Sequence, residues 1–142
     1  MKIAEVLRLK GSAVVTITPE TPVSGLVDQL AQHGVGALVV SADGQSLDGI
    51  VSERDVVRRL AAHGAGLLDH TVADIMTRSV RTCGLKDTVD ELMALMTEQR
   101  VRHVPVLEDG KLVGLVSIGD VVKQQIDVLK TERDQLEAYI TT

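Results

Sequence analysis

The sequence predicts an α/β fold in which one β-α-β-β-α unit occurs twice. GIVSERDV at residues 49–56 returns as GLVSIGDV at residues 114–121, with glycine, serine and aspartate at the same places. Around both copies, short apolar runs alternate with segments whose apolar residues have helical spacing. Glycine and aspartate gather where turns between paired strands are expected. These three observations indicate a duplicated unit with the same order of elements in each copy.

The repeat extends upstream of this signature. VVTITPETPV at residues 14–23 falls on VRTCGLKDTV at residues 80–89. A single unit of about 60 residues forms only a marginal core, so the two units are expected to pack together. We expect an N-terminal helix and the first repeat in residues 1–65, the second repeat in residues 66–125, and an extension of the last helix in residues 126–142.

The first half of each repeat is predicted to be a short strand followed by a helix. The strands are expected at Val14–Ile17 and Val80–Cys83. The helices are expected over residues 22–33 and 88–99, where apolar residues recur at helical spacing.

The second half of each repeat is predicted to be a strand pair followed by a second helix. A buried middle strand, ALVV or HVPVL, leads through a glycine- and aspartate-rich turn into a third strand, GIV or GLV. The second helix begins at SERDVVRRLAAH in one copy and at SIGDVVKQQIDVLK in the other. A short helix before the first strand and a long C-terminal helix complete the expected fold.

The composition narrows the class of partner. The formal net charge is -5 and the chain has one Tyr, no Phe and no Trp, which argues against nucleic acid as the main partner.

The single cysteine, Cys83, suits a reducing compartment. The N-terminus has no apolar signal region and no apolar run approaches the length of a membrane span. We expect a cytoplasmic protein that binds no membrane.

The repeated motifs resemble a tandem pair of CBS domains. The resemblance rests on the element order, on G-h-V-S-x-x-D in both copies and on the lead-in DIMT at residues 74–77, and it covers Ala4 to Lys123. It implies two repeats related by a pseudo-twofold axis. It also implies binding of adenosine-containing ligands in clefts between the repeats, and assembly of two pairs into a disc-shaped homodimer.

The serine and aspartate of each signature allow two interpretations. Ser52 with Asp55, and Ser117 with Asp120, have the spacing of a capping box that satisfies free N–H groups at a helix start. The same groups can bind a nucleotide: the resemblance implies that Asp55 and Asp120 bind ribose hydroxyls and that Ser52 and Ser117 bind phosphate. Capping and binding do not exclude one another.

The two expected clefts differ in charge. Arg102 and His103 precede the middle strand of the second repeat, where the first repeat has Gly36-Ala37. Related CBS pairs place basic residues here against nucleotide phosphates, and Arg bonds well to phosphate. The Asp120 cleft is therefore the favoured site. The first repeat instead carries Arg54 and Arg58, and Arg54 is free to lean into either cleft.

Further residues are nominated for the adenine and phosphate. An adenine needs apolar walls, and the first strand of one repeat is expected to line the cleft of the other. This pairs Val15 and Ile17 with Asp120, and Arg81 and Cys83 with Asp55. The lead-in residues nominated as contacts of phosphate or ribose are Lys10, Ser12 and Thr77.

The C-terminal helix carries an apolar stripe beyond what the repeat requires. Its positions alternate in steps of four and three residues, with one polar interruption at Arg133: Val122, Ile126, Leu129, Arg133, Leu136 and Ile140. The stripe either packs along its own chain or contacts a second copy in a dimer.

The sequence as a whole favours a regulatory binding module rather than an enzyme. We expect a homodimeric energy, redox or signal sensor that binds an adenine nucleotide, with AMP first and ATP, ADP, NAD or S-adenosylmethionine as alternatives. No catalytic residue, catalytic cofactor or metal site is expected. The client protein is not identified by the sequence. The second hypothesis is a scaffold that binds a protein and has vestigial clefts. The third hypothesis is an enzyme whose catalytic residues the sequence does not reveal.

Overall fold

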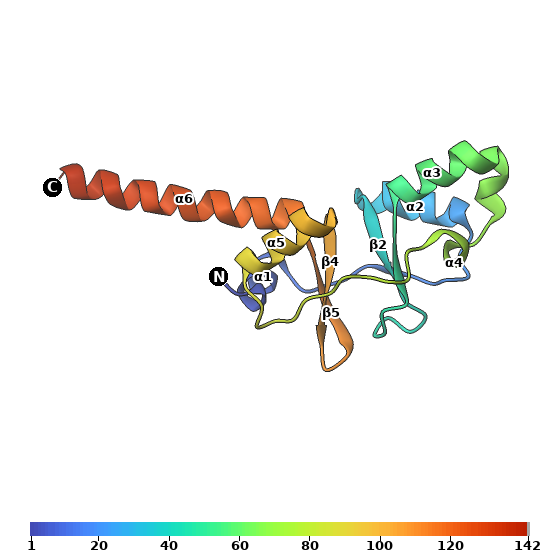
Figure 1. Ribbon diagram of the computed structural model, residues 1–142, viewed down its shortest axis with the longest axis horizontal. Coiled ribbons are helices and arrows are strands. Elements are labelled where there is room, and N and C mark those ends of the chain that lie inside the picture. Colours follow the sequence, from blue (N-terminus) through green and yellow to red (C-terminus); the bar gives the residue numbers. More distant parts are fainter. Residues whose placement is uncertain (142) are drawn as a thin grey trace.

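The computed structural model describes residues 1–141, which form two lobes and a long terminal helix (Figure 1). The helices are α1 (Ile3–Lys10), α2 (Val23–His33), α3 (Glu53–His63), the 3-10 helix η1 (Gly64–Asp69), α4 (Val72–Ile75), α5 (Val89–Gln99) and α6 (Ile118–Thr141). The strands are β1 (Thr16–Ile17), β2 (Ala37–Val40), β3 (Gly49–Ser52), β4 (His103–Glu108) and β5 (Lys111–Ser117). The α/β fold with two repeated units is confirmed, except that the first strand of the second unit is reduced to a single bridge. Thr142 lies outside the described residues.

The first lobe contains a three-stranded sheet in the order β1-β2-β3. β1 pairs with β2 in parallel, and β2 pairs with β3 in antiparallel register, with Leu38 opposite Val51. All four residues of β2 are buried, as expected for a central strand with both faces covered. β3 ends at Ser52, and α3 begins at the next residue of the first signature.

The second lobe has a two-stranded sheet, because the predicted strand Val80–Cys83 is reduced to a single bridge. Cys83 pairs with Val106 in parallel, with its N–H donating to Pro105 O at 3.1 Å. Extending this pairing upstream would need an N–H from residue 105, and proline has none. The prediction of a strand at Val80–Cys83 was therefore wrong, because Pro105 cannot donate the hydrogen bond that a longer strand would need. In the first lobe, by contrast, β1 forms but is shorter than the predicted Val14–Ile17.

Each lobe takes its lead-in helix from the other repeat. Ile3, Val6 and Leu7 of α1 pack in the core of the second lobe. Val72 and Ile75 of α4 pack in the core of the first lobe. The division of the chain at residue 65 stays a prediction for the repeats. The packed lobes do not coincide with these repeats, because α1 packs in the second lobe and α4 packs in the first.

The terminal helix α6 runs from the second lobe outward, away from the rest of the molecule (Figure 1). Of the expected stripe, Leu129, Leu136 and Ile140 are 61%, 64% and 78% exposed. The outer part of the stripe therefore does not pack along its own chain. Within residues 1–141, no helix is both long and apolar enough to cross a membrane.

Candidate functional site

Ser117 and Asp120 meet where β5 turns into α6. The Asp120 N–H donates to Ser117 Oγ at 3.2 Å, and the Ser117 N–H donates to Asp120 Oδ2 at 2.8 Å. This reciprocal pair satisfies two N–H groups at the helix start, as the capping interpretation predicts. It also fixes the Asp120 carboxylate at the junction of β5 and α6, where the side chain is 23% exposed.

Lys10, at the end of α1, reaches the same carboxylate. Its Nζ lies 2.6 Å from Asp120 Oδ2 and donates a second hydrogen bond, 2.7 Å long, to the carbonyl of Leu115. The exchange of lead-in helices is what brings α1 to this lobe. The structure thus joins Lys10, Ser117 and Asp120, which are three of the nominated residues.

The pKa of the Asp120 carboxyl is lowered from its ordinary value. Partial burial raises it, but the hydrogen bonds from Lys10 and Ser117 and the charge of Lys10 together outweigh burial. Asp120 is therefore an anion at neutral pH and can accept hydrogen bonds from hydroxyl groups.

His103 and Arg102 lie at the start of β4, beside this carboxylate. His103 is opposite Ser117 in the register of β4 and β5, and Arg102 is exposed. Burial is the main cause that lowers the pKa of His103; the charges of Asp120 and Glu53 raise it, while those of Lys10 and Arg102 lower it. The imidazole is therefore neutral at pH 7. Of the expected cationic wall, Arg102 therefore carries the charge and His103 does not, and the role of both toward phosphate stays a prediction.

The equivalent groups of the first lobe form a capping box of their own. The Ser52 N–H and Oγ both donate to Asp55 Oδ2, at 2.8 and 3.1 Å, and the Asp55 N–H donates to Ser52 Oγ at 3.4 Å. Within residues 1–141, no lysine bonds to Asp55 as Lys10 bonds to Asp120. Asp55 and Asp120 thus accept the same backbone hydrogen bond from the signature serine. They differ in that Asp120 forms an ion pair with Lys10.

The nominated apolar wall residues have two different environments. Val15 is 42% exposed and available to a ligand. Ile17 is 2% exposed and packs in the core of the first lobe. Its side chain has little surface for a ligand, and its role as an adenine wall stays a prediction.

Most of the remaining nominated residues are on the surface, whereas Cys83 is buried. Ser12, Arg54 and Arg58 are exposed, and among the described contacts none joins them to Asp55 or Asp120. Thr77 is held by its backbone, which exchanges hydrogen bonds of 2.9 and 3.0 Å with Ile50. Their roles toward phosphate or ribose stay predictions.

Two groups near the site were not found from the sequence. Glu53, the first residue of α3, acts electrostatically on His103 of the other lobe. The carbonyl of Leu115 is the second acceptor for Lys10. Glu53 stands where the second signature has Ile118, and this departure between the copies was the available signal. A backbone carbonyl leaves no signal in sequence.

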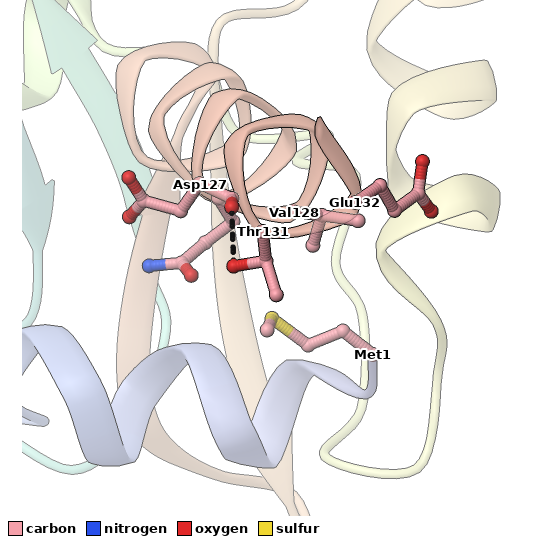
Figure 2. A pocket seen from close by; sticks show the side chains of 6 residues that line it. Met1, Asp127, Val128, Thr131 and Glu132 are labelled. Atoms are coloured by element: carbon pink, nitrogen blue, oxygen red, sulfur yellow. Dashed lines mark hydrogen bonds between the residues drawn. The ribbon is translucent and has the colours of Figure 1, made fainter. Parts of the chain in front are cut away.

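A hollow of about 260 Å³ lies between the N-terminus and α6 (Figure 2). It is lined by Met1, Gln124, Asp127, Val128, Thr131 and Glu132. Figure 2 shows the Thr131 hydroxyl turned back onto the Asp127 carbonyl, a bond of 3.0 Å. The lining has two carboxylates and, among the described residues, no lysine or arginine, so it does not suit a phosphate.

A larger hollow of about 590 Å³ lies between α2 and α3 of the first lobe. Most of its lining is apolar, including Val27, Val35 and Val57. Neither hollow contains Asp55 or Asp120. The candidate nucleotide sites are therefore defined by their hydrogen-bonding groups on the lobe surfaces. The α2–α3 hollow is a largely apolar surface whose lining includes Glu53.

Comparison with known proteins identifies the fold and the family. The CBS domain family model matches twice, at residues 5–62 and 72–127. A CBS domain-containing protein of Agrobacterium tumefaciens, ATU1752, is 43% identical with a TM-score of 0.84, over 88% of this chain and 99% of that one. The mitochondrial CBS domain-containing protein CBSX3 of Arabidopsis thaliana is 38% identical, over 97% of this chain and 71% of that protein.

A more distant structure has the same fold with ligands bound. The CBS domain pair of protein MJ0100, in complex with 5'-methylthioadenosine and S-adenosyl-L-methionine, is 23% identical with a TM-score of 0.77, over 87% of this chain and 98% of that one. The duplicated unit, the two signatures and the two matches of one family model agree. This chain belongs to the CBS-domain family and consists of two CBS domains in tandem.

Proposed function

We propose that this protein is a regulatory sensor of adenine nucleotides, with AMP as the first choice. The observation that carries the proposal is the Asp120 carboxylate, which is ionised, partly exposed and fixed by Ser117 at a helix start. Lys10 is bonded to it, and His103, with Arg102 next in sequence, lies close enough to interact with it electrostatically. A carboxylate in this position accepts hydrogen bonds from the vicinal hydroxyls of a ribose. Cations beside it bind the phosphate.

The family supports an adenosine-containing ligand. CBS pairs commonly bind such ligands, and the pair of MJ0100 has been seen with two of them. The cations of the second lobe favour a phosphorylated ligand over those two. AMP, ADP, ATP and NAD all carry the required ribose and phosphate, and S-adenosylmethionine carries the ribose only.

The first lobe supplies a second site in this proposal. Asp55 has the same backbone setting as Asp120, with exposed Arg54 and Arg58 nearby on α3. A ligand at either site acts by favouring one placement of the lobes, to the extent that its affinity differs between placements.

We further propose that the sensor is a homodimer. Apolar residues are exposed on α2 and α3 of one lobe and on α5 and α6 of the other: Val27, Val57 and Leu60 on the first, and Met93, Val122 and Ile126 on the second. The stripe on α6 continues the second face outward through Leu129 and Leu136. Faces of this kind are typical of interfaces between copies of a chain.

The α2–α3 hollow favours a second candidate function. An apolar surface of this size also fits a helix of another protein. A scaffold whose clefts bind no nucleotide is the corresponding alternative.

Thermal unfolding distinguishes the two functions. The protein, freed of co-purified nucleotide by unfolding and refolding, is heated with AMP, ADP, ATP, NAD or S-adenosylmethionine at 1 mM, and with guanosine monophosphate as the control. A nucleotide sensor shows a rise in Tm of several degrees with at least one adenine ligand, because a ligand at about 100 times its Kd stabilises the native state by about 2.7 kcal/mol. No rise with any adenine ligand supports the scaffold.

Sedimentation equilibrium tests the homodimer. Val57→Asp in the α2–α3 hollow and Leu129→Asp in the stripe place a charge on each apolar face, and each is expected to weaken self-association. Gln135→Glu, on the same helix but off the stripe, is the control. A wild-type protein that is monomeric at 100 µM would contradict the dimer.

We place the sensor in the cytoplasm, on the evidence of its single buried thiol. The Arabidopsis relative is named as a mitochondrial protein. Fractionation of cells that express the natural protein tests this assignment.

A further inference from the structure

We propose that Lys10 is the specificity-determining residue of the second-lobe site: it occupies the Asp120 carboxylate in the free protein and moves to the phosphate when a nucleotide binds. The site thereby selects phosphorylated nucleotides over nucleosides. This inference rests on the proposed function and names the ligand class of one of its two sites.

The first step is that Lys10 and a ribose compete for the same oxygen. Asp120 Oδ2 accepts from Lys10 Nζ at 2.6 Å and from the Ser117 N–H at 2.8 Å. A carboxylate oxygen has two lone pairs, so Oδ2 is fully used. We take the two vicinal hydroxyls to bind in the bidentate arrangement, with one hydroxyl on each carboxylate oxygen. The Ser117 N–H belongs to the helix cap and stays, so it is Lys10 that must leave Oδ2.

The second step is that the Lys10 ammonium group can leave Asp120, although it also donates to the Leu115 carbonyl. Lys10 is the last residue of α1, and its side chain is 32% exposed. Its four-carbon stem carries a point charge with three rotatable donors. An exposed ion pair of this kind is weak, so its separation reduces affinity only a few-fold.

The third step is that only a phosphate gives Lys10 a new partner. A nucleoside displaces the ammonium group into water and offers it nothing. A nucleotide brings an anion close to Lys10 and to the start of β4, where the exposed Arg102 adds a second positive charge. The charge-assisted bond from Lys10 to phosphate then replaces the bond to Asp120. The ion pair therefore lowers affinity for nucleosides and not for nucleotides.

The first lobe lacks this exchange and is an internal comparison. Asp55 accepts only from Ser52, so no cation has to leave. The Ile50 carbonyl, equivalent to that of Leu115, accepts from the backbone N–H of Thr77 at 2.9 Å instead of from a lysine. In the first lobe the backbone N–H of Thr77 thus donates to the carbonyl that corresponds to the acceptor of Lys10 in the second lobe. Selection by charge exchange thus belongs to the Asp120 site alone.

Calorimetric titration of AMP and adenosine tests the inference. Asp55→Asn is used as the background, so that the second-lobe site dominates the heat, and folding of every variant is checked by circular dichroism. Lys10→Met is expected to reduce the preference for AMP over adenosine by about tenfold, through weaker AMP binding. Adenosine affinity is expected to stay the same or to rise a few-fold. Lys10→Arg is expected to retain most of the preference.

Arg8→Met is the matched control, because it removes the same charge from the same turn of α1 and its residue makes no bond to Asp120. An unchanged preference in Lys10→Met overturns the inference, and so does an equal loss for both ligands, which would make Lys10 a structural support. If the wild type binds AMP but the Asp55→Asn protein binds neither ligand, the inference about the Asp120 site is overturned. If the wild type binds none of AMP, ATP and NAD, the proposed function itself fails.

Discussion

Leu7 of the first repeat lies directly against Gly114 of the second. A Cβ placed on Gly114 would come within 2.6 Å of Leu7 Cδ1. At the matching place in the other lobe, a Cβ on Gly49 would come within 2.7 Å of the Thr77 carbonyl oxygen. The glycine that opens both signatures is therefore the point where the exchanged lead-in crosses the third strand, and no larger residue fits there.

Alanine at either glycine is expected to destabilise the protein. Such overpacking costs about 1–3 kcal/mol. Gly49→Ala is expected to cost more than Gly114→Ala, because it meets a backbone carbonyl while the other meets a leucine side chain. Urea unfolding measures both. Gly66→Ala, which meets no atom within 4 Å, is the control. Equal stability of all three variants would contradict the exchanged packing.

Loss of the Ser52 side chain is expected to lower the free energy of unfolding by about 1 kcal/mol. Ser52 Oγ accepts the Asp55 N–H, and its removal leaves that group at the start of α3 without its partner. Ser79→Ala, at an exposed position between the lobes, is the control and should change little. If Ser52→Ala is as stable as the wild type, the signature serine does not act as a cap.

Stability is expected to fall as the pH drops below 6.5, in part through His103. Burial lowers the pKa of His103 from its ordinary value of 6.5. The unfolded chain then takes up a proton that the folded protein does not, so acid favours unfolding until the pH reaches the lowered value. His103→Gln removes this contribution.

The measurement is the free energy of unfolding at pH 7.5, 6.5 and 5.5. The loss between the first and last values should be smaller in His103→Gln than in the wild type. His33→Gln, at an exposed helix end, is the control for removal of an imidazole. A larger loss in His103→Gln would mean that the histidine is stabilised in its charged form.

Cys83 is expected to be unreactive in the folded protein. Burial, and to a lesser degree the charge of Asp87, raises the pKa of its thiol to about 12. The thiolate is the reactive form, so modification by a disulfide reagent at pH 8 should be at least about a hundredfold slower in the native protein than in guanidinium. Equal rates in both states would show that Cys83 is accessible and that the second-lobe core opens readily.

Local patterns in the sequence predicted the elements well where the physics is local. Helices expected over residues 22–33 and 88–99 are found at Val23–His33 and Val89–Gln99. The strand at Val80–Cys83 failed because its pairing depends on Pro105 in a distant segment. The exchange of α1 and α4 was also missed, because periodicity shows which face of a helix is buried and not which lobe buries it.

The candidate site was predictable in part for the same reason. The bonds between Ser117 and Asp120 follow from a spacing of three residues at a helix start. Lys10 was nominated only as a contact of the ligand. Its bond to Asp120 depends on the exchanged helix and spans 110 positions in the chain. No local pattern contains that information.

The most direct test of the central claim is isothermal titration of AMP against the nucleotide-free wild type, Asp120→Ala and Asp55→Ala. The wild type is predicted to bind AMP, and Asp120→Ala is predicted to remove most of that binding while Asp55→Ala removes less. Absence of AMP binding by the wild type, together with no binding of ATP or NAD, would contradict the claim and leave Asp120 as a helix cap alone.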